Sequence, residues 1–257
     1  MAYHIKSHVN TDTIFPTVDA TYIIHLRGNG RYKNVKKQLK QYPLTKNVHI
    51  VVNKGYKKFK KPNIDSPAKD LIHAYMFCFE HAKQYNNILI LEDDFIIDPS
   101  LYKHKDNINT FVKSHIDFVY RLGCIPFVMI PYDTYNYIGL TLGAHAIMYS
   151  TSVRTQLLEN QNEIYKCDYD LYLNYYFNYI YYTPVIYQLY PETENQKKWG
   201  EFSLPTKIVG YILKYLLKFL LLDKQVNPGY NFFYFISKYL FILLFILLFI
   251  LNKINYL

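Results

Sequence analysis

The stretch ILILEDDFIID, residues 88–98, joins an apolar run directly to three consecutive acids. Ile88 to Leu91 are apolar without alternation, which is typical of a strand that is buried on both faces of a sheet. Glu92, Asp93 and Asp94 follow at the end of this strand, where their mutual repulsion costs stability. The stretch therefore indicates either a solvated turn or a site that holds a positive group.

Strand and helix patterns alternate on the N-terminal side of this stretch. TYIIHL (21–26) and VHIVV (48–52) have the composition of strands, and a basic amphipathic helix is expected between them. A second helix is expected to begin with Ser66 as N-cap and Pro67 at the first helical position. This alternation predicts an α/β fold with a Rossmann-like, mostly parallel mixed sheet flanked by helices.

The remaining elements are less sharply marked. Residues 1–20 show no clear period and are expected to be a short lead-in, and residues 54–63 are expected to be a loop with solvated charges. Further strands are expected at 118–123, 127–131, 137–142, 146–150 and 184–190, and helices at 151–160 and 168–179.

The composition changes after Trp199. Residues 206–226 predict an amphipathic helix at a membrane surface, with Lys207, Lys214 and Lys218 on one side. Residues 230–257 predict a hydrophobic helix, transmembrane or monotopic, because the apolar run 232–251 would reach about 30 Å as a helix. A buried core helix is the alternative interpretation. Residues 1–205 are then expected to form the catalytic domain.

The net charge of +9 suits acidic partners such as nucleotide phosphates, anionic lipid or nucleic acid, without choosing among them. The three cysteines fit no paired spacing, and the N-terminus is polar. These features predict reduced thiols and no signal peptide. We therefore expect a protein attached to a membrane by its C-terminal helix, with the catalytic domain facing the cytosol.

The three acids at the strand end have the chemistry of a metal site. Residues i and i+2 of an extended chain point the same way, so Glu92 and Asp94 are expected to face one site while Asp93 points elsewhere. In open α/β sheets, ligands bind beyond the carboxyl ends of the strands. Carboxylate oxygens suit Mn²⁺ or Mg²⁺. The spacing therefore predicts a divalent metal with open positions for a diphosphate.

Three blocks of the sequence resemble glycosyltransferase family 25, the lipopolysaccharide and collagen galactosyltransferase family. They are TYIIHLRGNGR (21–31), SPAKDLIHAYMFCFEHAKQYNNILILEDD (66–94) and GLTLGAHAIMYS (139–150), and they occur in the family's order. The resemblance implies a GT-A fold, in which a D-x-D-type motif holds a divalent metal and a nucleotide-sugar.

The resemblance also implies roles for individual residues. Asp94 would bind the metal, Glu92 would bind the metal or the hydroxyls of the sugar-nucleotide, and Asp93 would orient both from behind. His25, Arg27 and Asn29 would lie near the base and ribose of the donor.

A "G-x-H" core in the third block is matched by Gly143 and His145. His145 would contact the metal, the donor or the acceptor, or would be a structural histidine. No histidine follows His145 in the sequence, so a further metal ligand must be an acid or a water. The candidate acids are Asp168, Asp170, Glu192 and Glu194.

A transferase that inverts the anomeric centre needs a base for the acceptor hydroxyl. Asp168 and Asp170, at the start of an expected helix, are the candidates, with helix capping by Asp168 as the alternative. Glu192, Glu194 and Trp199 either line an acceptor site or belong to a polar loop.

Together these features predict a membrane-attached, metal-dependent hexosyltransferase that moves a sugar from a nucleotide-sugar, with UDP-hexose as the expected donor. The acceptor would be a glycan, lipid-linked or protein hydroxyl, and no nucleic-acid partner is expected. A non-catalytic membrane-anchored domain of the same fold is one alternative. A metal-dependent phosphotransferase or nuclease is another, disfavoured because the sequence has no P-loop.

Overall fold

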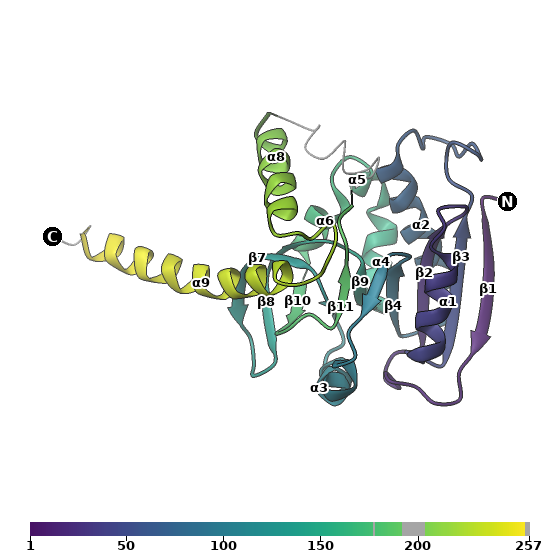
Figure 1. Ribbon diagram of the computed structural model, residues 1–257, viewed down its shortest axis with the longest axis horizontal. Coiled ribbons are helices and arrows are strands. Elements are labelled where there is room, and N and C mark those ends of the chain that lie inside the picture. The colour runs from purple at the N-terminus through teal and green to yellow at the C-terminus, as the bar shows by residue number, and fades with distance from the viewer. Residues whose placement is uncertain (177, 192–203, 255–257) are drawn as a thin grey trace.

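The computed structural model describes residues 1–176, 178–191 and 204–254. Within them, one sheet has nine strands in the order β1-β3-β2-β4-β9-β6-β10-β8-β7, and β11 pairs with β5 in a small second sheet (Figure 1). The strands are β1 (Tyr3–Val9), β2 (Ala20–Leu26), β3 (Asn47–Asn53), β4 (Asn87–Glu92), β5 (Phe95–Ile97), β6 (Val119–Arg121), β7 (Ile125–Pro131), β8 (Asn136–Leu142), β9 (Ala146–Ser150), β10 (Asn178–Tyr181) and β11 (Ile186–Gln188). The helices are α1 (Tyr32–Gln41), α2 (Pro67–His81), α3 (Leu101–Ser114), α4 (Thr151–Glu159), α5 (Gln161–Ile164), α6 (Tyr169–Tyr172), the 3-10 turn η1 (Leu173–Tyr175), α8 (Leu204–Phe219) and α9 (Gly229–Ile254).

The large sheet is mixed. β2 lies parallel to both β3 and β4, and β10 lies parallel to β6. The other neighbouring strands in the large sheet are antiparallel. The predicted α/β class, with a mixed sheet flanked by helices, is therefore confirmed. Among the described strands, fewer neighbouring pairs are parallel than the sequence suggests.

Helices cover both faces of the sheet around β4. Leu89 and Leu91 pack in the cluster that includes α1 and α3, whereas Ile88 and Ile90 pack in the cluster that includes α2 and α4. Both faces of β4 are thus buried, which explains its unbroken apolar run. The prediction for this strand is confirmed.

Helix α2 begins as the sequence predicts. The Ser66 side chain accepts a hydrogen bond from the backbone N–H of Lys69 over 3.3 Å, and Pro67 takes the first position. The preceding loop differs from expectation at Lys61, which is buried and forms an ion pair with Asp70. The prediction of solvated charges over residues 54–63 is therefore wrong for Lys61.

Residues 3–9 form an edge strand instead of a lead-in. β1 pairs antiparallel with β3, and Tyr3 is its one fully buried residue. Because backbone pairing rather than side-chain burial holds this strand, its apolar alternation is weak. Helix α3 is also absent from the sequence expectations, although its buried residues Leu101, Ile108, Phe111 and Val112 follow a helical period.

The helix expected over residues 168–179 is only partly present. Short turns, α6 and η1, occupy its first half, and β10 begins at Asn178. The side-chain Nδ2 of Asn178 donates to the carbonyl oxygen of Gly139 over 3.0 Å, and Arg121 Nε donates to Asn178 Oδ1 over 2.7 Å. Pairing with β6 and β8 thus overrides the local helical pattern.

A third buried cluster joins α8 and the first turns of α9 to the region of β7 and β10. Its members from the C-terminal segment are Leu213, Leu217, Leu220, Leu222, Tyr230, Phe233 and Tyr234. The packed core therefore extends past residue 205, and the boundary expected there would divide this cluster.

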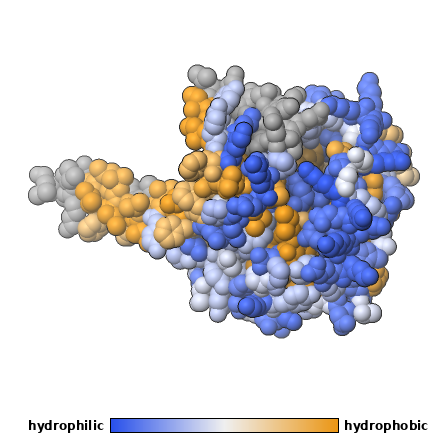
Figure 2. Space-filling model, in the orientation of Figure 1, coloured by the Kyte–Doolittle hydropathy of each residue, from blue (hydrophilic) through white to orange (hydrophobic). Residues whose placement is uncertain are grey.

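The C-terminal part of α9 projects away from the body of the protein (Figure 1). Large apolar side chains such as Phe245 and Phe249 are exposed there, and Figure 2 shows the projecting segment as hydrophobic. Among the described residues, one segment, Gly229–Asn252, is long and apolar enough to cross a membrane by length and composition, with only 12% of its most apolar window buried.

Candidate active site

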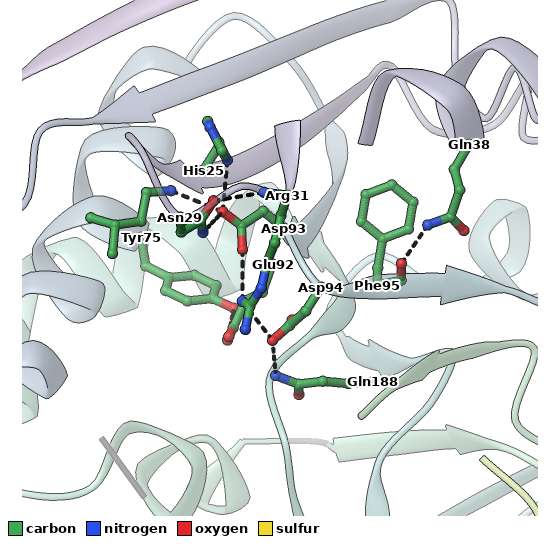
Figure 3. A network of polar contacts seen from close by, with 11 residues as sticks. His25, Asn29, Arg31, Gln38, Tyr75, Glu92, Asp93, Asp94, Phe95 and Gln188 are labelled. Carbon is green, nitrogen blue, oxygen red and sulfur yellow. Dashed lines mark hydrogen bonds and ion pairs between the residues drawn. The ribbon is translucent and has the colours of Figure 1, made fainter. Parts of the chain in front are cut away.

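Asp93 holds the turn after β2 against the end of β4 (Figure 3). Its Oδ2 accepts hydrogen bonds from His25 Nδ1 over 2.7 Å, from the backbone N–H of Leu26 over 3.0 Å and from Asn29 Nδ2 over 2.6 Å. Arg31 Nη1 donates to its Oδ1 over 3.0 Å. Burial alone would raise the pKa of Asp93, but the bonds from His25, Asn29 and Arg31 outweigh it and lower the pKa.

We expect Asp93→Ala to reduce the free energy of unfolding by about 3 kcal/mol, because it removes the ionised partner of a buried network. The measurement is denaturant unfolding of the full chain in detergent. Asp65→Ala is the matched control, since the Asp65–Lys69 pair is solvent-exposed and should contribute little to stability. Equal losses in the two variants would show that Asp93 does not hold this turn.

Glu92 and Asp94 lie close enough to repel each other, and Arg31 Nη1 bridges Asp94 to Asp93. Burial raises the pKa of Glu92, and the charges of Asp94 and Asp170 raise it further. The pKa of Asp94 is raised by burial, although Arg31 and Gln188 oppose that effect. The strand end thus holds more negative charge than Arg31 neutralises.

The two oxygens of Asp94 have different surroundings. Oδ2 accepts from Arg31 Nη1 over 2.9 Å and from Gln188 Nε2 over 3.0 Å. Oδ1 is buried and has no hydrogen-bond partner within the described protein. A buried carboxylate oxygen without a partner is costly, so Oδ1 is suited to contact a bound ligand or ion.

Asp170 is a fourth acid near this strand end. Its Oδ2 accepts the backbone N–H of Gly143 over 2.8 Å. Burial and the neighbouring Asp168 raise the pKa of Asp170 to about 6. Asp168 instead caps α6, where its Oδ1 accepts the backbone N–H groups of Asp170 and Leu171 over 3.0 and 3.2 Å. Asp170 therefore contacts the backbone just before β9, whereas Asp168 holds the first turn of α6.

His145 is fully buried just before β9, beside the end of β4. Its Nε2 lies 3.3 Å from the carbonyl oxygen of Ile186, and its Nδ1 has no partner within the described protein. Burial lowers the pKa of His145 to about 3, so the ring is neutral at physiological pH. A neutral ring that donates from Nε2 leaves Nδ1 as an acceptor.

The other residues expected near a nucleotide divide into two groups. His25 and Asn29 bind Asp93, whereas the Arg27 side chain is exposed and lies at a pocket of about 650 Å³. The pocket is lined by Met1, Tyr3, His4, Lys6, His25, Arg27, Tyr32, Val52 and Lys54. His25 binds Asp93 and also lines this basic pocket, so the pocket adjoins the acidic end of β4.

A divalent metal fits the site only with help from a substrate. Among the described residues, no three His, Cys, Asp or Glu side chains gather closely enough to hold a metal ion by themselves. Glu92 and Asp94, with the unpartnered Oδ1, still provide a pair of oxygen ligands of the kind that Mn²⁺ or Mg²⁺ accepts beside substrate phosphates. Glu192, Glu194 and Trp199 lie outside the described residues.

Sequence reasoning missed Arg31, Gln188 and Tyr75 as residues of this site. Arg31 pairs with two acids, and the Tyr75 hydroxyl lies 3.2 Å from Glu92 Oε1. Arg31 could have been found, since it ends the first resembling block beside a turn. Gln188 carries no local signal, because 94 residues separate it from its partner Asp94.

We expect Glu92→Gln to stabilise the metal-free protein by about 1 kcal/mol at pH 8, the ordinary size of a single-site effect. The raised pKa means that the folded state favours the protonated carboxyl. The stability that the protonated Glu92 carboxyl contributes is fully present below the ordinary pKa of a glutamate. It is lost as the pH rises through the raised pKa of the folded state. The gain should therefore vanish near pH 4, as thermal unfolding at both pH values would show. Equal stability of Glu92→Gln and the wild type at pH 8 would contradict the repulsion between Glu92 and its neighbouring acids.

The sequence matches no protein-family model, and no curated protein matches it significantly. Among solved structures, A197 from STIV is similar with a TM-score of 0.43 and 10% identity, over 69% of this chain and 87% of that one. A glycosyltransferase involved in the glycosylation of the major capsid of PBCV-1 is similar with a TM-score of 0.32 and 10% identity, over 56% of this chain and 68% of that one. A putative glucose-1-phosphate thymidylyltransferase from Bacillus anthracis has a TM-score of 0.39 and 9% identity, over 83% of this chain and 99% of that one. Similarity at this level supports no conclusion about function.

Proposed function

We propose that this chain is a GT-A-type glycosyltransferase that depends on a divalent metal and moves a sugar from a nucleotide-sugar to a hydroxyl group. One observation carries the proposal: Glu92 and Asp94, buried acids with raised pKa values, lie at the carboxyl end of the parallel strand β4, with Asp170 of α6 near them and a basic pocket beside them. Perturbed acids in such a crevice are typical of functional sites. The three blocks that resemble glycosyltransferase family 25 contribute to this same region.

Glu92 and Asp94 would hold Mn²⁺ or Mg²⁺, which neutralises the diphosphate as it leaves. Their repulsion supports this assignment, because a bound cation would relieve it. Arg31 already pairs with Oδ2 of Asp94, while Oδ1 has no partner in the part of the chain that the structure describes. Asp93, paired with His25 and Arg31, would keep the two neighbouring carboxylates in place.

The donor nucleotide would occupy the basic pocket beside His25. Lys6, Arg27 and Lys54 line it and would attract phosphates, and Tyr32 offers an aromatic face. The ring of Tyr32 lies 5.2 Å from that of His25, and Lys6 lies over the Tyr32 ring at 4.8 Å. A nucleotide here would have its diphosphate directed towards Asp94.

Asp170 would act as the base of an inverting reaction. Its carboxylate would take the proton of the acceptor hydroxyl as the new bond to the anomeric carbon forms and the bond to the diphosphate breaks. A pKa of about 6 keeps Asp170 ionised at neutral pH while it remains basic enough to accept a proton. Asp168 is already engaged as a helix cap, so Asp170 is the stronger candidate of the pair.

The exposed part of α9 would anchor the protein in a membrane, with the catalytic domain on the cytosolic side. The exposed side chains of α8 include Ile212, Tyr215 and Phe219, beside Lys218, which suits contact with the membrane surface. Lys238 is held instead by the protein, because its Nζ donates to the carbonyl of Tyr182 over 2.8 Å. The acceptor would then be lipid-linked or close to the membrane.

A donor screen tests the proposal directly. The purified full chain in detergent is incubated with UDP- and GDP-hexoses, with Mn²⁺ or with EDTA, and the release of the nucleoside diphosphate is measured. We expect release from one donor class that requires Mn²⁺ and increases when a lipid-linked acceptor is added. Binding of a nucleotide without turnover for any donor and acceptor would favour a non-catalytic domain. Metal-dependent release of UMP or GMP, with the hexose phosphate moved to the acceptor, would favour a phosphotransferase.

A truncation after Lys238 should yield a soluble, folded protein, because it removes the projecting segment and keeps the third buried cluster. The full chain should pellet with membranes and resist extraction by carbonate. A truncation after Pro205 should aggregate, since it would expose Ile125 and Met129. Sedimentation and circular dichroism of the three chains check this. A full chain that stays in the supernatant without detergent would contradict the membrane anchor.

A further inference from the structure

A continuous path of hydrogen bonds connects the acidic end of β4 to the first turn of α9. Gln188 Nε2 donates to Asp94 Oδ2 over 3.0 Å. The Tyr230 hydroxyl accepts the backbone N–H of Gln188 over 3.0 Å and donates to its carbonyl oxygen over 3.1 Å. Both backbone groups of one site residue thus depend on a single buried hydroxyl of the C-terminal helix.

The surroundings leave this hydroxyl little freedom. The ring of Tyr230 packs edge-on against Tyr187, with 4.9 Å between ring centroids and 78° between their planes, and Tyr230 is fully buried. Gln188 pairs across β11 and β5 with Phe95, the residue after Asp94. The Tyr230 hydroxyl also lies 3.5 Å from His145 Nε2. A displacement of Tyr230 would therefore reach Gln188 and Asp94 together.

We propose that Tyr230 is a positioning residue that holds Gln188, so that its amide fixes Oδ2 of Asp94 and leaves Oδ1 directed at the ligand position. This inference rests on the proposed function. It makes the first turn of the membrane-directed helix a part of the active site.

Tyr230→Phe tests the inference, because it removes only the hydroxyl. Tyr234→Phe is the matched control: Tyr234 is also buried in α9, and its hydroxyl lies 3.6 Å from Cys124 Sγ, away from the acids. We expect Tyr230→Phe to weaken Mn²⁺ binding by about tenfold, the usual cost of losing a partner behind a metal ligand. Tyr234→Phe should leave it unchanged. The dissociation constant of Mn²⁺ is measured on the full chain by the electron paramagnetic resonance of free Mn²⁺.

A double-mutant cycle separates positioning from general damage to the fold. Gln188→Ala should weaken Mn²⁺ binding at least as much as Tyr230→Phe, and the double variant should lose nothing more, because one residue acts through the other. Additive losses, or no loss in Tyr230→Phe, would overturn the inference.

Hydrogen exchange gives a readout that needs no metal. The backbone N–H of Gln188 loses its acceptor in Tyr230→Phe, so a peptide that covers β11 should exchange faster than in Tyr234→Phe. If the wild-type chain bound no Mn²⁺, the proposed function would fail, and the exchange rates alone would decide whether Tyr230 positions Gln188. Equal exchange in both variants would overturn the inference.

Discussion

Asp94→Ala should abolish sugar transfer while the protein stays folded. The variant loses a carboxylate with a buried oxygen, Oδ1, that has no hydrogen-bond partner among the described residues. We expect turnover at saturating Mn²⁺ to fall at least about 1,000-fold, or about 4 kcal/mol in the activation barrier. The measurement is the release of the nucleoside diphosphate with a fixed donor and acceptor.

The control for this variant is Asp106→Ala. Asp106 is an exposed acid on α3, so its removal makes the same change in net charge away from the site. It should retain full turnover, and both variants should show the circular dichroism of the wild-type chain. Turnover of Asp94→Ala close to that of the wild type would exclude a metal role for this residue.

Asp170→Asn should lower kcat by about 10²- to 10⁴-fold and keep the affinity for the donor, since only the proton transfer is lost. In the wild-type chain the base must be deprotonated, so kcat/KM should fall as the pH drops through about 6, the raised pKa of Asp170. Turnover of the Asn variant should lack this dependence. Steady-state kinetics between pH 5 and 8 check both expectations.

Asp168→Asn provides the comparison for Asp170. Because asparagine caps a helix about as well as aspartate, this replacement should keep α6 folded and leave kcat largely intact. If Asp168→Asn instead loses transfer and Asp170→Asn keeps it, the assignment of the two residues is reversed. If both variants turn over normally, the base is another residue or the reaction retains configuration.

The central strands could be predicted from the sequence because their signals are local. The apolar run of β4 reflects burial on both faces, and the capped start of α2 involves residues three positions apart. The three acids also stand together at the end of β4 in the sequence, although the Arg31 that bridges Asp93 and Asp94 is not marked there. These features depend on short-range geometry that a sequence displays directly.

The rest depends on contacts between distant parts of the chain. Asp93 meets His25 across 68 residues, and His145 meets Tyr230 across 85. β10 contradicts its own helical pattern because β6 and β8 offer backbone partners on both sides. The first turn of α9 looks like the start of a membrane anchor in the sequence, whereas in the fold it supports the acidic site.

A metal–diphosphate site can be tested by calorimetric titration of the full chain with a nucleoside diphosphate, in Mn²⁺ and in EDTA. We expect UDP, or the diphosphate of whichever donor turns over, to bind at least about tenfold more tightly with Mn²⁺. Asp94→Ala should remove this difference. Equal affinity in Mn²⁺ and EDTA, or a metal effect that survives in Asp94→Ala, would contradict a metal–diphosphate site at the end of β4.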